Sequence, residues 1–167
     1  MGTVSQKKLG FRENLWGRLP EGWNLKRLKE LTSKIGDGIH ATPTYIKESE
    51  YYFINGNNLV NGKIVIHKGT KCVSINEYHK FSKELTNKTI LISINGTIGN
   101  IALYNDERVI LGKSAAYINC NTNIYKLYLY YLLQTNRINR YFEIELTGST
   151  IRNLSLASIL SNSLFPT

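Results

Sequence analysis

The chain has 167 residues, 42% of them hydrophobic and 20% charged, which suits one globular domain with a real core. Its 21 lysines and arginines outnumber 12 acidic residues, and the formal net charge of +9 attracts polyanions such as nucleic acids without identifying one. Because the sequence has neither a run of about 18 apolar residues nor the apolar centre of a signal peptide, we expect a cytoplasmic protein without membrane contact.

The first 18 residues show no clear periodicity, so we expect a flexible lead-in at 1–18 and a domain at 19–167. The domain opens with a turn and an aromatic anchor at Leu19–Trp23. Leu25, Leu28 and Leu31 then recur at helical spacing.

Gly36–Pro43 is a glycine-rich loop that contains Asp37 and His40. Turn chemistry explains its Asp-Gly pair, because the carboxylate accepts backbone N–H groups, and no nucleophile lies nearby in the sequence. A metal-dependent nuclease that uses Asp37 and His40 remains an alternative. His40 and Thr42 are also suited to contact a ligand, since loops on a rigid scaffold often carry binding residues.

The middle of the chain predicts a meander followed by a helix. Tyr51–Ile54 and Ile64–Ile66 are expected strands, separated by asparagine-glycine turns. Ile75–Phe81 suits a short helix with Ser74 as its cap. The lysines between residues 63 and 88, interleaved with tyrosine and histidine, suit a phosphate backbone and equally suit a solvated surface.

The segment Ile90–Leu103 is the strongest local signal, because two β-rich runs flank the turn Asn95–Gly99. Asparagine followed by glycine between such runs favours a hairpin. Alternation in the first run predicts an apolar face with Ile90 and Ile92 and a more polar face with Ser93. We therefore expect a central hairpin in the sheet.

Further strands of the same sheet are expected at Val109–Leu111 and Ala115–Ile118. Between them Gly112-Lys113-Ser114 lacks the earlier glycine and the following helix of a phosphate loop. Tyr125–Ile144 predicts one amphipathic helix. After it comes a polar loop, in which Ser155 caps a last short helix.

These elements predict a mixed α/β (α+β) fold, with a mostly antiparallel twisted sheet, a central hairpin and flanking helices. No cofactor motif or metal-binding helix is present, and the candidate acids of a nuclease lie in separate elements: Asp37, Asp106, Glu143 and Glu145. Cys72 and Cys120 stand too far apart to suggest a disulfide framework or zinc site, and we expect two buried thiols.

Several motifs occur in a characteristic order: L-P-x-G-W at 19–23, G-D-G-x-H-x-T-P at 36–43, L-I-S-x-x-G-T-I-G-x-x-A-L at 91–103, a tyrosine-rich helix at 125–133 and G-S-T-x-x-N-L-S-L at 148–156. In this order they resemble the specificity subunit of type I restriction-modification systems. The resemblance implies a non-catalytic target recognition domain without a cofactor, which reads one half of a split site in double-stranded DNA. Its implied partners are the methyltransferase and restriction (nuclease) subunits.

Family members of full length carry two recognition domains and long helical spacers, whereas this sequence shows one domain and no spacer. Three interpretations of this chain therefore remain open: a truncated subunit, a fragment, or a half-subunit that self-associates. A protein-interaction module without DNA affinity is a further alternative, favoured if the lysines are scattered over opposite faces.

For a DNA-binding domain we expect lysines to hold phosphates and short polar side chains on loops to contact bases. The expected phosphate contacts are Lys34, Lys68, Lys71, Lys80, Lys83 and Lys113. The expected base or loop contacts are His40, Thr42, Asn95, Thr97, Arg152 and Asn153. Asn95, Thr97, Arg152 and Asn153 equally suit a purely structural role.

Overall fold

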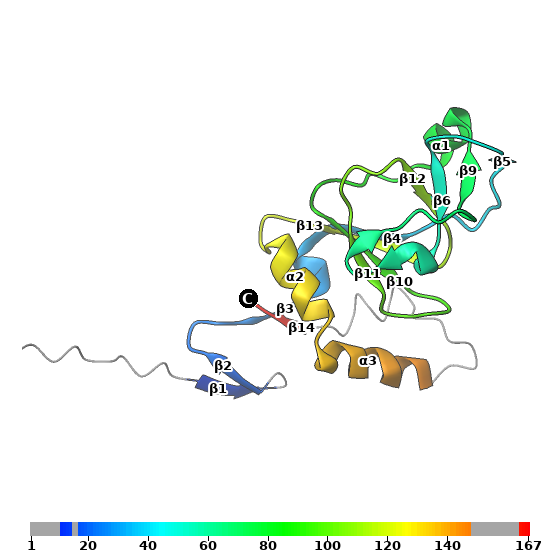
Figure 1. The fold of residues 1–167 in the computed structure, drawn as a ribbon. Helices are drawn as coiled ribbons and strands as arrows, with labels where there is room; N and C mark the ends of the chain where they lie inside the picture. Colours follow the sequence, from blue (N-terminus) through cyan, green and yellow to red (C-terminus); the bar gives the residue numbers. More distant parts are fainter. Residues whose placement is uncertain (1–10, 15–16, 148–163) are drawn as a thin grey trace, which may run out of the picture.

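The main core is built on a four-stranded antiparallel sheet in the order β11-β10-β13-β4 (Figure 1). Its strands are β4 (Thr32–Asp37), β10 (Thr89–Ser93), β11 (Ile101–Leu103) and β13 (Ala115–Cys120). The computed structural model describes residues 11–14, 17–147 and 164–167. Its α+β class and mostly antiparallel sheets confirm the fold predicted from the sequence.

The predicted hairpin is present, with Ile90 opposite Leu103 in β10 and β11. Its connection is a loop in which the backbone N–H of Asn100 donates to the Ser93 hydroxyl (2.8 Å). Gly96 and Gly99 take positive φ angles of 76° and 85°, a conformation that glycine adopts without steric cost.

The expectation of a polar face on β10 was wrong, because every residue of the strand is buried. Ile90 and Ile92 pack into the core cluster that includes the helices, and Leu91 packs into a second cluster on the opposite face. Ser93 is buried as well, and its hydroxyl is satisfied within the hairpin. Two apolar layers therefore cover this strand.

A second four-stranded sheet has the order β12-β6-β9-β5. Its strands are β5 (Tyr45–Ile46), β6 (Tyr52–Ile54), β9 (Lys71–Val73) and β12 (Val109–Leu111). The prediction that 109–111 joins the hairpin's sheet was wrong, since β12 pairs in parallel with β6. The Gly112–Ser114 turn thus carries the chain from one sheet to the other.

Shorter elements lie beside the two sheets: a helix packs at the second sheet, and a pair of short strands lies along β11 of the first. Helix α1 (Ile75–Phe81) has the predicted bounds, and the Ser74 side chain caps it by accepting the Glu77 N–H (3.2 Å). The 3-10 turn η2 (Gly56–Asn58) leads into the two-residue strands β7 (Leu59–Val60) and β8 (Lys63–Ile64). The latter ends before the predicted Ile66.

Near the chain's start, β1 (Phe11–Asn14) pairs with β2 (Gly17–Pro20), where no element was predicted. The expected helical turn at 25–31 is instead β3 (Leu25–Arg27) followed by the 3-10 turn η1 (Leu28–Glu30). Strand β3 pairs with β14 (Leu164–Pro166), which places Phe165 in the core.

The single helix predicted at 125–144 is two helices, α2 (Lys126–Leu133) and α3 (Asn136–Thr147), which run in different directions (Figure 1). The break lies at Thr135, whose hydroxyl donates to the Leu132 carbonyl (2.7 Å), a local bond that competes with a continuous helix. Both helices have an inward face, as predicted for an amphipathic helix, and Leu129, Leu133 and Ile138 are buried on these faces.

Cys120 is buried and Cys72 is only half-buried, so the prediction of two buried thiols holds for one of them. The predicted loop at 148–156 and the Ser155-capped helix lie outside the described residues. Among the described helices, none is long and apolar enough to cross a membrane.

Candidate nucleic-acid interface

The glycine-rich loop 36–43 is seated against the turn that joins the two sheets. The backbone N–H of Gly38 donates to the Ala115 carbonyl (2.9 Å), and that of Ile39 donates to the Leu111 carbonyl (2.7 Å). A Cβ atom on Gly38 would lie 2.1 Å from the Gly112 carbonyl oxygen. Only glycine therefore permits this close approach of two backbones.

Two other segments meet the same turn through Ser114. The backbone N–H of Ile94, in the hairpin loop, donates to the Ser114 carbonyl (3.0 Å). The Ser114 hydroxyl accepts the Gly56 N–H (2.9 Å) and donates to the Asn55 side-chain oxygen (3.0 Å). We call this meeting of residues 36–43, 55–58, 94–100 and 112–114 the loop end of the domain.

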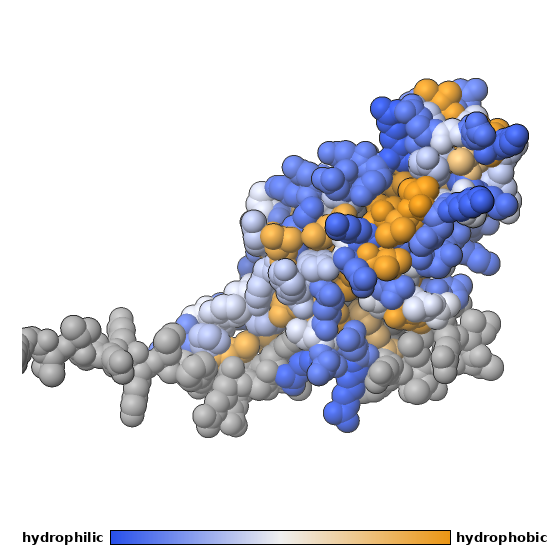
Figure 2. All heavy atoms as spheres, in the orientation of Figure 1, coloured by the Kyte–Doolittle hydropathy of each residue, from blue (hydrophilic) through white to orange (hydrophobic). Residues whose placement is uncertain are grey.

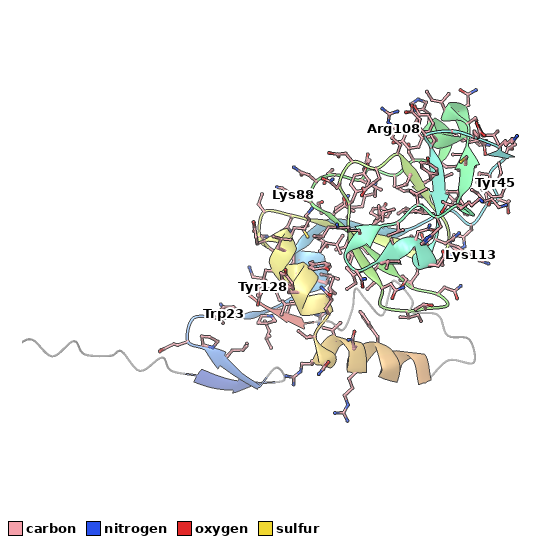
Figure 3. The ribbon with its side chains drawn as sticks, viewed as in Figure 1. Trp23, Tyr45, Lys88, Arg108, Lys113 and Tyr128 are labelled. Carbon is pink, nitrogen blue, oxygen red and sulfur yellow. The ribbon has the colours of Figure 1, made fainter. Side chains whose placement is uncertain are left out.

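The loop end brings together most of the predicted base contacts. His40, Thr42 and Thr97 are exposed, and Asn95 is half-buried. Lys113 is exposed at the shared turn, on the outer edge in Figure 3. Arg152 and Asn153 lie outside the described residues. An exposed lysine beside several exposed polar loop residues is the composition needed to contact both phosphates and bases.

The His40 ring and the Asp37 carboxylate lie 2.7 Å apart at the loop end. The side chain of His40 is 73% exposed, and that of Asp37 is 36% exposed. Within the ranges that the structure describes, no group of three or more histidine, cysteine or acidic side chains is placed to hold a metal ion. The contact with Asp37 orients the His40 ring in the loop.

The other predicted phosphate contacts are spread over the second sheet and the far end of β4. Lys71 lies on β9 and Lys68 in the turn before it, both exposed. Lys80 on α1 lies 3.8 Å from Glu77 and 4.8 Å from the centre of the Phe81 ring. Figure 2 shows that hydrophilic residues cover most of this part of the visible surface.

Two of the lysines are less available for phosphates. Lys83, which follows α1, is half-buried. Lys34 forms an ion pair with Glu84 (2.8 Å) near the end of β4 away from the loop end. The hydrogen bond with Glu84 raises the pKa of Lys34, and the same bond lowers the pKa of Glu84. A phosphate would have to displace this carboxylate.

A pocket of about 470 Å³ borders the loop end, and no motif of the sequence indicates it. Its lining includes Tyr45, Phe53, Asn57, His67 and Lys71. The stretch at 55–58 was interpreted as a turn, and strand pairing then brings it beside residues 67–71. The neighbourhood of Asn57 and Lys71 depends on this pairing, which local sequence does not reveal.

A larger cavity of about 730 Å³ lies away from the loop end, where α2 begins. Lys88, Cys120 and Tyr125 are among its lining residues. Burial raises the pKa of the Cys120 thiol to about 11, so the thiol is protonated at neutral pH. No predicted contact residue lines this cavity.

Solved structures share the fold. A chain from a structure described as the basis of complex assembly and conformational transition of the type I R-M system matches with a TM-score of 0.66 and 22% identity, over 93% of this chain and 36% of that one. The HsdS subunit of Thermoanaerobacter tengcongensis matches with a TM-score of 0.61 and 20% identity, over 89% of this chain and 33% of that one.

The S subunit of a type I restriction-modification system from M. genitalium also matches, with a TM-score of 0.57 and 17% identity, over 87% of this chain and 34% of that one. This chain thus spans about a third of the length of each structure. Among curated proteins, none matches its sequence.

The family model described as the type I restriction modification DNA specificity domain matches residues 20–164. That range includes both four-stranded sheets, the loop end and the helices α1 to α3. The order of motifs that resembled this family is therefore supported over nearly the whole domain. The chain belongs to the type I restriction modification DNA specificity domain family.

Proposed function

We propose that this chain is a target recognition domain that reads one half of a bipartite sequence in double-stranded DNA for a type I restriction-modification system. The observation that carries the proposal is the family match over residues 20–164. The loop end supports it, because three polar segments and Lys113 meet there. The formal charge of +9 adds a general attraction for the phosphate backbone.

In this proposal the loop end contacts bases through His40, Thr42, Asn95 and Thr97, and Lys113 holds a nearby phosphate. Lys68 and Lys71 extend the phosphate contacts along the second sheet, followed by Lys80 and Lys83. Lys34 contributes least, because Glu84 already pairs with it. Phosphate contacts fix the position of the domain, and the loop side chains provide the sequence preference.

The chemistry of methylation and cleavage belongs, in this proposal, to separate methyltransferase and restriction subunits. The domain would direct these subunits to DNA and would itself be non-catalytic, acting in the cytoplasm where the DNA lies. A second recognition domain, on the same polypeptide or on a second copy, would read the other half of the site. Joining two half-sites raises affinity through effective concentration.

A duplex titration at several salt concentrations tests the proposal. Four to six phosphate contacts predict a slope of log affinity against log salt of about −4 to −5. Lys113→Ala should reduce the magnitude of the slope by about one, equally for all sequences. Lys88→Ala, at the cavity away from the loop end, is the matched control and should leave the slope unchanged. Binding that does not depend on salt would refute the proposal.

The contact between Asp37 and His40 is the one observation that favours a nuclease. Magnesium prefers oxygen ligands, so one carboxylate and one imidazole are a poor ligand set for it. Incubation of the purified chain with DNA and magnesium distinguishes the two functions. We expect no cleavage, and turnover that Asp37→Ala abolishes would establish the nuclease instead.

A further inference from the structure

The floor of the 470 Å³ pocket is one face of the second sheet. Phe53 and Lys71 stand directly opposite each other in β6 and β9, so their side chains leave the same face. Tyr45, from the neighbouring β5, packs on that face with its ring centre 5.7 Å from that of Phe53. Tyr45 is 38% exposed, so the floor presents an accessible aromatic surface with a lysine beside it.

One wall of the pocket is held rigidly by Asn58. This side chain is 4% exposed. It donates to the Val65 carbonyl (2.9 Å) and the Thr70 hydroxyl (3.1 Å), and it accepts the Asn55 N–H (3.0 Å). The Thr70 hydroxyl also accepts the His67 N–H (2.8 Å). These bonds fix the turn at 67–70 against the segment 55–58, so the pocket is preformed.

Asn57 differs from its neighbour because it is exposed at the pocket and makes no side-chain hydrogen bond within the described part of the chain. Its amide therefore offers both a donor and an acceptor. Asn58 fixes the backbone next to Asn57, so Asn57 has a defined position. Among the described residues, none forms a hydrogen bond with its side-chain amide. A preformed position with free hydrogen-bonding groups is the arrangement expected of a recognition side chain.

The pocket is continuous with the loop end. A Cβ atom on Gly112 would lie 2.3 Å from the Asn55 side-chain oxygen and 2.6 Å from the Phe53 ring. Both of these residues line the pocket, and Lys113 follows Gly112 in the chain. Figure 3 shows Tyr45 and Lys113 along the same edge of the molecule. A duplex that contacts Lys113 would therefore also lie close to the pocket.

We infer that this pocket reads an A·T base pair in the major groove, with Asn57 as the side chain that determines specificity. An asparagine amide matches the N7 acceptor and N6 donor of adenine, and an exposed aromatic ring suits the methyl group of thymine. Lys71 and Lys68 would hold adjacent phosphates. The inference rests on the proposed function, because it needs duplex DNA as the ligand.

Selection of duplexes from a random pool, followed by sequencing of the bound fraction, tests the inference with the full chain. Asn57→Ala should lose the preference for one A·T pair and keep the others. A good bidentate contact corresponds to a discrimination of roughly 5- to 150-fold. Asn87→Ala, an exposed asparagine at the cavity away from the loop end, is the matched control and should select the wild-type sequence.

Base analogues then test the same contact without altering the protein. In the selected site, 7-deaza-adenine removes the N7 acceptor and should weaken wild-type binding, whereas Asn57→Ala should be insensitive to it. Deoxyuridine removes the thymine methyl, and Tyr45→Ala should abolish the resulting difference.

The outcomes separate the inference from the proposed function. If wild type selects a sequence and Asn57→Ala selects the same one, or if neither analogue affects wild-type binding, the pocket does not read bases. If wild type binds no duplex, or binds all sequences equally, the proposed function fails. If the pocket binds a protein partner instead of bases, Asn57→Ala should select the same sequence as the wild type.

Discussion

Replacing Gly38 by alanine tests whether the loop end is held together as described. The new Cβ atom would lie 2.1 Å from the Gly112 oxygen and 2.3 Å from the Leu111 oxygen. Both contacts are with backbone, so no side chain can rotate away. We expect loop 36–43 to be released from the turn that carries Lys113.

The free-energy change follows from the contacts that are lost. Two backbone hydrogen bonds, from Gly38 and Ile39, contribute about 1–3 kcal/mol together. Ile39 is 9% exposed, and exposing its side chain costs about 1.5–3 kcal/mol. Complete release of the loop should therefore lower the free energy of unfolding by about 2.5–6 kcal/mol, a large part of a stability of about 5–15 kcal/mol.

Urea denaturation of Gly38→Ala measures this change, with Gly69→Ala as the matched control. A Cβ atom on Gly69 meets nothing within 4 Å, and this residue has no positive φ angle. The control should be neutral or more stable by about 0.4–1 kcal/mol, since alanine restricts the unfolded chain. Equal stability of the two variants would refute the proposed seating of the loop.

Three further predictions concern the interior. At pH 8, iodoacetamide should modify Cys72 before Cys120. Burial raises the pKa of Cys120 to about 11, so this thiol forms about a hundredfold less thiolate than an ordinary thiol. Equal modification rates of the two cysteines, measured by mass spectrometry, would contradict this prediction. Burial also raises the pKa of the Tyr104 hydroxyl to about 12. As the pH rises, the hydroxyl therefore ionises in the unfolded chain before it does so in the folded chain. The free energy of unfolding should fall by about 2–3 kcal/mol between pH 10 and 12. Tyr104→Phe should remove that part of the fall in urea titrations, and an unchanged pH profile would oppose the assignment. Leu91 lies on the face of β10 that packs into the second core cluster. Leu91→Ala should cost about 2–5 kcal/mol and Ile66→Ala, at a side chain that is 40% exposed, much less. Similar losses of stability would show that this face of β10 is not buried.

Local signals in the sequence predicted the elements that depend on local chemistry. The β10–β11 hairpin has its glycines at positive φ, and α1 begins at its serine cap. In each case neighbouring residues supply the bonds that define the element. The α+β class followed from the same signals.

The errors arose where distant residues decide the structure. Val109–Leu111 is an apolar run that suits either sheet, and its parallel pairing with β6 is set by tertiary contacts. The helix break at Thr135 was hidden because the apolar period continues across it to Ile138. The alternation in β10 suggested one solvated face, but Leu91 packs into a second core cluster.

The candidate site was predicted in part for the same reason. The glycine-rich loop and Lys113 were recognised from their residue types. Their meeting beside Ser114 and the pocket beside Asn57 depend on pairings between distant residues, such as Gly38 with Ala115, which are 77 positions apart.

The pairing of β3 with β14 has a consequence for the order of events during folding. Asn24 and Thr167 exchange two backbone hydrogen bonds of 2.8 Å, and Phe165 is fully buried with Leu28 and Leu31. Phe165 lies about 140 residues from these two leucines in the sequence. Closing so long a loop is slow, so we expect this seam to form late when the chain refolds from denaturant. Until it forms, the part of the core surface that Phe165 covers stays exposed to solvent.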